Sequence, residues 1–400
     1  IFKTGVSQID NIFQNPKSKI QISNSNQQLT NNNLSSEVTE SLDIRKIVWK
    51  GAWELGLRYP LFGTGVETFA YAYNFVRPQE HNLTSEWDYI YNKAHNEYLN
   101  YLATTGFLGL GTYLLFIGSV AWLVYFQLKT KSENGKTTAK NLELICLSAG
   151  WITILITNFF GFSITVTSLF FFLIPALIAI ESESIKEYEK EIPILNHSYR
   201  FLVPLVGFLF VVYLGWITLY FIADIQYAKG KLFAQIEDFQ QSAGYIQAAQ
   251  RIHHEHLYED KLSNVLANFL YDPSIQSDKK TLDKVIQVSN ALNTKSLIAS
   301  NQNVQYWKTR SKNNLIYYQI TSEGKYLNNS IEAVKIARKL APTDPRIPYT
   351  LSLLYRLQAD EAKDEEKTVL TQLSQEELNK AIMLKPNYAE AIELKNKISN

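Results

Sequence analysis

The chain has 400 residues, of which 46% are apolar, and a formal net charge of +1. A near-neutral charge argues against a nucleic-acid or general polyanion binder, which carries a large basic excess. Cys146 is the only cysteine, which excludes a disulfide framework and a cysteine-based metal site. The chain begins at Ile1 without a signal-peptide pattern, so we expect further residues upstream.

The first hundred residues divide into a polar loop and a segment that contains a helix. Residues 1–40 are rich in Asn, Ser and Gln and predict a flexible loop. Within residues 41–103, the stretch SLDIRKIVWKGAWELGLR (41–58) repeats apolar residues at helical spacing, which predicts a helix at a membrane interface. Its expected apolar face consists of Ile44, Val48, Trp49, Ala52, Trp53 and Leu57. Pro60, Gly63 and Gly65 then predict a turn.

Residues 104–225 contain four apolar stretches of the length, about 20 residues, that crosses a bilayer. They are residues 104–126, 141–158, 160–180 and 201–223. The alternative is the buried core of a large soluble protein, but four runs with so little charge favour a membrane region. Residues 141–180 also fit a re-entrant pair, and the sequence leaves this open.

The loop QLKTKSENGKTTAK, between the first two stretches, predicts the orientation of the chain. It contains four lysines and one glutamate, and short loops rich in Lys and Arg stay in the cytoplasm. Residues 41–103 are therefore expected outside the cytoplasm. If all four stretches cross the membrane, residues 226–400 lie outside as well.

Residues 226–400 are expected to be helical throughout and to contain repeats. Ala-x-x-Leu-x-Pro occurs twice, at Ala337/Leu340/Pro342 and at Ala381/Leu384/Pro386. The prolines are 44 residues apart, which equals a period of about 34 plus an insertion of about ten. We place the insertion in the acidic stretch QADEAKDEEK. The pattern resembles tetratricopeptide repeats, an α-solenoid that binds protein partners, although an unrelated helical bundle would also fit.

His95 lies just before the first apolar stretch and is a candidate catalytic residue. Its ordinary pKa near neutrality suits a general base. Arg45, on the expected interfacial helix, carries a permanent fork of donors for phosphate. Together they suit a reaction on a lipid-linked phosphate outside the cytoplasm, although a histidine here can also be an ordinary interfacial residue.

Residues 45–113 resemble the core signature of the O-antigen ligase and O-antigen polymerase superfamily. The matching residues are Arg45, Trp49 and Ala52, then Pro60, Gly63, Gly65 and Phe69, then Ala94, His95, Asn96, Tyr98 and Leu99, then Gly106, Gly109 and Tyr113. The resemblance implies an all-α, multi-pass glycosyltransferase of the GT-C-like type in the bacterial inner membrane. It implies transfer of a glycan from an undecaprenyl-pyrophosphate donor to a hydroxyl of a glycan, lipid or protein acceptor, without metal or other cofactor.

The resemblance also implies roles for individual residues. His95 would be the catalytic residue that accepts the proton of the acceptor, and Arg45 would bind the donor pyrophosphate. Asn96 would fix the loop beside the substrate. Arg77 and Lys93 are further candidates for phosphate binding, although each is also readable as a surface charge. The family uses a second arginine on an upstream helix, which nothing before Arg45 here can supply.

Other histidines and other functions compete with this interpretation. His81 lacks the Ala-His-Asn context and ranks below His95. His253, His254 and His256 resemble a metal cluster, but without further ligands we expect a surface helix. The alternative functions are a protein O-oligosaccharyltransferase of the same superfamily, a non-catalytic membrane scaffold that recruits partners through the repeats, and a transporter of lipid-linked sugars. A transporter would need charged or polar residues deep inside its spans, where these stretches show mainly Ser, Thr and Asn158 and where Glu143 lies only near a start.

Overall fold

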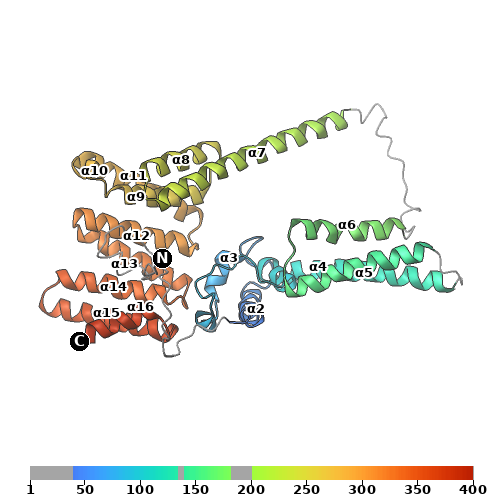
Figure 1. Cartoon of the computed structure of the whole chain (residues 1–400), viewed down its shortest axis with the longest axis horizontal. Helices are drawn as coiled ribbons and strands as arrows, with labels where there is room; N and C mark the ends of the chain where they lie inside the picture. Colours follow the sequence, from blue (N-terminus) through green and yellow to red (C-terminus); the bar gives the residue numbers. More distant parts are fainter. Residues whose placement is uncertain (1–38, 134–138, 182–200, 400) are drawn as a thin grey trace, which may run out of the picture. The chain divides into compact units, whose positions relative to one another are not determined.

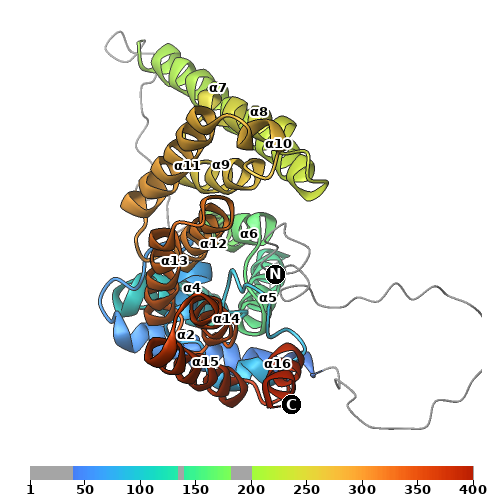
Figure 2. The ribbon, with the colours of Figure 1, turned by 90° about the vertical axis from the view of Figure 1, so that its left-hand side faces the viewer.

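The computed structural model describes residues 39–133, 139–181 and 201–399, and the regular elements in these ranges are all helices (Figures 1 and 2). The described chain divides into an N-terminal unit within Ser36–Asn196 and a C-terminal unit within His197–Asn400. The expected flexible loop over residues 1–40 lies outside the described residues, apart from residues 39 and 40. The helical content agrees with the all-α prediction.

The N-terminal unit contains long helices and short helical turns within its described residues. The long helices are α2 (Ser41–Arg58), α4 (Glu97–Glu133), α5 (Ala139–Phe160) and α6 (Thr165–Glu181), and the short ones are α3 (Phe69–Ala72), η1 (Tyr73–Phe75) and η2 (Gln79–Leu83).

Helix α2 has the bounds that the sequence predicts, but its buried face is rotated. Its buried residues are Ile44, Val48, Gly51, Ala52, Leu55 and Gly56. Trp53 and Leu57, which were expected on this face, are 49% and 53% exposed, so that part of the prediction is wrong. A Cβ on Gly51 or Gly56 would lie 2.5 Å or less from a packed side chain. The close approach along this glycine edge decides which side of the helix is buried.

Helices α4, α5 and α6 pack through a column of aromatic rings. Tyr113 of α4 stacks on Tyr101 of the same helix and on Phe171 of α6, with centroids 4.3 and 5.2 Å apart. Trp151 of α5 stacks on Phe171 at 5.7 Å and donates its indole N–H to the Phe171 carbonyl oxygen at 2.9 Å. The three helices lie side by side (Figure 1). This packing brings the end of α5 next to the start of α4.

Three helices in the described part of the chain are long and apolar enough to cross a membrane: Glu97–Lys129, Leu142–Phe160 and Leu202–Gln235. They correspond to the first, second and fourth expected spans, and the first begins earlier than expected.

The third expected span, 160–180, is a shorter apolar helix over Thr165–Ile180, about 24 Å long at 1.5 Å per residue. Residues 161–164 are not helical, and among them the Ser163 N–H donates to the Glu97 carboxylate (3.3 Å). Residues 182–200 lie outside the described part of the chain, so a full-length span for this segment stays a prediction.

The C-terminal unit begins with one long helix and continues with shorter ones. Its described helices are α7 (Leu202–Gln235), α8 (Phe239–Ile252), α9 (His256–Phe269), α10 (Pro273–Gln276), α11 (Lys279–Ala299), α12 (Val304–Thr321), α13 (Gly324–Leu340), α14 (Arg346–Glu361), α15 (Asp364–Leu384) and α16 (Ala389–Ser399).

Helix α7 runs without interruption from an apolar segment into the packed part of this unit. Residues 202–222 are all exposed, whereas Ala223, Tyr227 and Gly230 are buried against the following helices. Figure 1 shows α8 alongside the second part of α7. The candidate span and the first helix of the packed unit are therefore one continuous element.

Most of the remaining helices form hairpins with the same internal contact. The hairpins are α7/α8, α9/α11, α12/α13 and α14/α15, and Figure 2 shows the last two in succession. In each, a serine hydroxyl of the second helix donates to a backbone carbonyl oxygen of the first. The pairs are Ser242 to Gly230 (2.8 Å), Ser289 to Ser263 (2.5 Å), Ser330 to Ser311 (2.9 Å) and Ser374 to Ser352 (2.8 Å). Small residues at these positions let the two backbones approach closely.

Both copies of the Ala-x-x-Leu-x-Pro motif end the second helix of a hairpin. Ala337 in α13 and Ala381 in α15 are fully buried. Their carbonyl oxygens accept the N–H of Ala341 (2.9 Å) and of Lys385 (3.0 Å), which closes each helix in the same way. The acidic stretch expected as an insertion contains the end of α14 and the start of α15.

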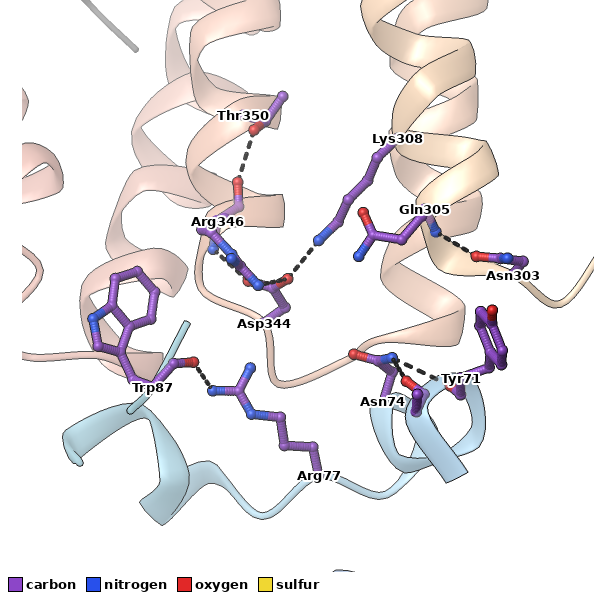
Figure 3. A network of polar contacts seen from close by, with 11 residues as sticks. Tyr71, Asn74, Arg77, Trp87, Asn303, Gln305, Lys308, Asp344, Arg346 and Thr350 are labelled. Atoms are coloured by element: carbon purple, nitrogen blue, oxygen red, sulfur yellow. Dashed lines mark hydrogen bonds and ion pairs between the residues drawn. The ribbon is translucent and has the colours of Figure 1, made fainter. Parts of the chain in front are cut away.

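Asp344, shortly after the first copy, joins α12 to α14. Its buried carboxylate accepts hydrogen bonds from Lys308 (2.7 Å) and from Arg346 (2.8 and 2.9 Å), as Figure 3 shows. Burial alone would raise the pKa of Asp344, but the two cations hold it well below its usual range. The carboxylate is therefore ionised at neutral pH and connects consecutive hairpins.

Candidate functional site

Three of the expected site residues lie where helix ends of the N-terminal unit meet. His95 and Asn96 immediately precede α4, and Phe160 ends α5. Arg45 of α2 reaches the same place through its bond to Phe160. Lys93 and Arg77 take part in other contacts, so the structure brings three of the five candidates together.

His95 has a left-handed backbone conformation, with a φ of 55°. This conformation is disfavoured by about 1–2 kcal/mol for a residue with a Cβ. The indole N–H of Trp49 donates to the His95 carbonyl oxygen at 3.2 Å. The imidazole packs edge-on against Tyr91 and Phe162, with centroids 5.7 and 5.2 Å away. Contacts from α2, from the preceding loop and from the α5–α6 turn therefore position this side chain.

The environment of His95 favours its neutral form. Burial lowers the pKa of the imidazole, the positive charge of Arg45 lowers it further, and the carboxylate of Glu86 opposes them. The imidazole is therefore neutral at pH 7, and its unprotonated nitrogen can accept a proton. Glu86 lies in no recognisable motif and is therefore not a candidate from the sequence alone.

Arg45 binds the end of α5. Its Nη1 donates to the carbonyl oxygen of Phe160 at 2.7 Å, so the cation lies at the negative end of the helix dipole. The side chain is only partly buried. A guanidinium has five N–H donors, and one bond leaves others for an anionic ligand.

Asn96 joins α4 to α5. Its side chain is buried, its Oδ1 accepts the N–H of Leu99 (2.9 Å), and its Nδ2 donates to the Phe159 carbonyl oxygen (2.9 Å). The first bond caps the N-terminus of α4 and the second satisfies the last turn of α5. Both ends of the amide are used inside the protein, which agrees with the expected role in fixing the loop.

Lys93 and Arg77 differ from each other in exposure and partners. The Lys93 ammonium forms an ion pair with Glu67, and the two side chains are 19% and 69% exposed. Arg77 is only 6% exposed and donates to the Trp87 carbonyl oxygen (Figure 3). The interpretation of Arg77 as a surface charge is therefore wrong, because its guanidinium holds the loop together from within.

His81 is a core residue. It is fully buried, and its Nδ1 lies 3.0 Å from the hydroxyl of Tyr73. Burial and the nearby charge of Arg77 lower its pKa to about 4. It is neutral at physiological pH and has no access to solvent, which supports ranking it below His95.

The turn after α2 docks into a break in α4. The helix is interrupted at Gly106, which has a φ of 69°. The backbone bonds across the break run from the N–H of Thr64 to Ala103 (3.0 Å), of Gly65 to Thr104 (2.9 Å) and of Phe107 to Pro60 (2.7 Å). A Cβ on Gly63 would lie 2.3 Å from the backbone of α4, and one on Gly106 would lie 2.4 Å from the Leu61 carbonyl oxygen. Gly63 and Gly106 of the sequence signature are thus explained by close backbone approach.

The three C-terminal histidines do not share one helix. His253 follows the last residue of α8 as its C-cap, His254 lies in the connection and His256 begins α9, so the expectation of a surface helix is wrong. The His254 Nε2 lies 3.0 Å from the buried carboxylate of Glu259. Among the described residues, no group of three or more metal-ligating side chains is placed to hold a metal ion.

Comparison with known proteins gives a match at this site. Residues 6–114 match the family model described as O-antigen ligase, and no curated protein matches the chain. The matched range contains Arg45, His95 and Asn96, and it includes the turn that docks into α4. The chain therefore carries an O-antigen ligase family domain over residues 6–114.

Proposed function

We propose that this protein transfers a glycan from an undecaprenyl-pyrophosphate donor to an acceptor hydroxyl at the extracytoplasmic face of the membrane. The observation that carries the proposal is His95, neutral and held in a fixed conformation, with the cation of Arg45 close enough to lower its pKa. A proton acceptor beside a phosphate-binding cation, at the start of a candidate span, fits a lipid-linked pyrophosphate donor.

The reaction balances with these two groups. The acceptor oxygen attacks the anomeric carbon as the bond from that carbon to the pyrophosphate oxygen breaks. The pyrophosphate leaves with the electron pair, and the free N–H groups of Arg45 neutralise its growing charge. The hydroxyl proton passes to the unprotonated nitrogen of His95. Asn96 acts indirectly, because its bonds to α4 and α5 hold the loop that carries His95.

Substitution of the two residues tests the proposal. In the full-length protein, His95→Gln and Arg45→Ala are each expected to lower the rate of glycan transfer by about 100-fold or more, because each removes a group that acts in the transition state. The lipid-linked precursor should accumulate, and the acceptor that loses its glycan identifies the subtype. Membrane levels of all variants are compared, and Arg58→Ala, an exposed arginine of the same helix, is the matched control. If the glycans are unchanged in both variants, the glycosyl-transfer proposal is wrong and the non-catalytic membrane scaffold is the better interpretation.

The residual activity of Arg45→Ala gives a second readout. Because Arg45 lowers the pKa of His95, its removal should raise that pKa. Activity needs neutral His95, so the acidic limb of the pH–rate profile should move to higher pH. The pH–rate profile of Arg58→Ala should match that of the wild type. Identical profiles for wild type, Arg45→Ala and Arg58→Ala would show that Arg45 does not affect the pKa of His95 during the reaction.

We also propose that residues 226–400 form a tetratricopeptide-like solenoid that binds a protein partner. The repeated serine-to-carbonyl contact in four successive hairpins supports a common ancestral unit. The identical closure of α13 and α15 at the two motif copies supports it further. Solenoids of this kind present extended surfaces to other chains.

A further inference from the structure

Helix α7 is longer than a membrane span, and its composition marks where the bilayer ends. At 1.5 Å per residue, about 20 residues cross the hydrocarbon core, so a span that starts at Leu202 ends near Phe221. Trp216 contacts Tyr213 and Tyr220, at 6.3 Å between ring centroids in both pairs. Trp and Tyr gather at headgroup depth. Trp216 and Tyr220 therefore lie in the last turns of the span, toward the interface through which α7 leaves the membrane.

Helix α8 returns along α7 toward this aromatic group. Near its start, the Ser242 hydroxyl bonds to the Gly230 carbonyl oxygen, and further along, Ile246 packs against the same glycine. At its end, the ring of His253 lies 4.8 Å from that of Tyr220 and 6.0 Å from that of Trp216. The connection from α8 to α9 thus lies at the depth of the last turns of the span, although it belongs to the packed helical unit.

The residues of this connection suit a lipid interface. We call residues 251–257 the α8–α9 corner. Arg251 is exposed, the side chains of His254 and His256 are 60% and 49% exposed, and Leu257 is 47% exposed. The imidazoles of His253 and His254 face the carboxylates of Glu255 and Glu259. Exposed Arg251 and Leu257 beside a Trp–Tyr group combine polar and apolar contacts in the way that interfacial segments do.

We propose that the α8–α9 corner is a membrane-surface contact, in which Arg251 hydrogen-bonds to phospholipid phosphates while Leu257 enters the headgroup–acyl boundary. The occupant is the bilayer that α7 itself crosses. The helical unit is then attached to the membrane at two places, α7 and the corner, which fixes its tilt and its rotation about α7. The proposal does not depend on the glycosyl-transfer chemistry.

Depth measurement with spin labels tests this contact. The full-length protein, with Cys146→Ser to remove its exposed thiol, is placed in nanodiscs of phosphatidylethanolamine and phosphatidylglycerol. One label is attached through His254→Cys and a control label through Glu237→Cys, at the α7–α8 turn where the hairpin is farthest from the corner. We expect several-fold lower collision with a water-soluble nickel chelate at position 254 than at 237. We also expect broadening of the 254 signal by gadolinium-labelled lipid headgroups. Equal nickel collision at both positions would overturn the proposal.

A pair of leucine variants distinguishes lipid from protein as the occupant. Leu257→Asp in the corner should raise nickel collision at position 254, whereas Leu232→Asp, at a leucine of α7 that is beyond the span and 58% exposed, should not. If position 254 is shielded from nickel but insensitive to gadolinium lipids, a protein surface covers the corner and the lipid proposal is wrong. Circular dichroism of each variant checks that the helices are retained.

Discussion

At the residue scale, the site depends on how one strained residue is held. His95 adopts a conformation that glycine prefers, yet it carries the proposed chemistry. Its carbonyl oxygen accepts from Trp49, and the following Asn96 fixes the start of α4. Strain at a functional position persists where surrounding contacts determine it. Trp49 is therefore a positioning residue for His95, and its place in the sequence signature has a physical reason.

The substitution Trp49→Phe tests this positioning role. Phenylalanine can keep the edge contact with Phe159, now at 5.8 Å, but it cannot donate to His95. We expect kcat to fall about five- to tenfold with KM little changed, since loss of one hydrogen bond is worth about 1 kcal/mol. Steady-state kinetics with a defined lipid-linked donor measure kcat and KM separately. Trp53→Phe, on the exposed side of the same helix, should behave as wild type, and a change in KM alone would contradict the role.

At the element scale, the break in α4 explains several signature residues at once. The turn around Gly63 and Gly65 exchanges backbone hydrogen bonds with the two sides of the break at Gly106. A continuous helix would satisfy these groups internally, and the break exposes them to the turn. The junction connects α2, which bears Arg45, to α4, which follows His95.

Gly106→Ala is expected to disrupt this junction. An added Cβ would meet the Leu61 carbonyl oxygen at 2.4 Å, and the φ of 69° disfavours alanine. We expect a loss of about 2–4 kcal/mol of stability, measured as a lower midpoint of thermal unfolding in detergent. Gly111→Ala is the control, because its Cβ would meet no atom within 4 Å. Equal midpoints for the two variants would show that the docked turn does not stabilise α4.

At the scale of the whole molecule, the C-terminal unit contains a buried carboxyl that links its stability to pH. Asp260 of α9 accepts hydrogen bonds from Asn293 of α11 (3.0 Å) and Thr309 of α12 (2.8 Å). Burial is the largest influence and raises the pKa of Asp260 from 3.8 to about 7, against the lowering effect of these bonds. The folded state therefore holds a proton that the unfolded state has lost between about pH 4 and pH 7.

The sign of the pH effect follows from this difference. Stability from Asp260 is fully present below about pH 4 and falls as the pH rises to about 7, by up to about 4 kcal/mol. In Asp260→Asn this dependence should vanish, so the variant should gain stability relative to wild type between pH 5 and pH 8. Hydrogen exchange of α9, α11 and α12 in the full-length protein measures this change in stability. The exposed Asp283→Asn of α11 is the control, and a parallel pH dependence in wild type and Asp260→Asn would contradict the prediction.

The sequence by itself determined the helical class, three of the four spans, the bounds of α2 and the importance of residues 41–113, because periodicity, length and motif order are local properties. The buried side of α2 and the internal positions of Arg77 and His81 depend on the tertiary structure. It also decided that the glycine turn enters a break in α4 and that the serine contact recurs in each hairpin. These features depend on contacts between segments far apart in the chain. In the sequence these contacts are marked only by single glycines and serines. The role of such a residue can be assigned only when the backbone that packs against it is known.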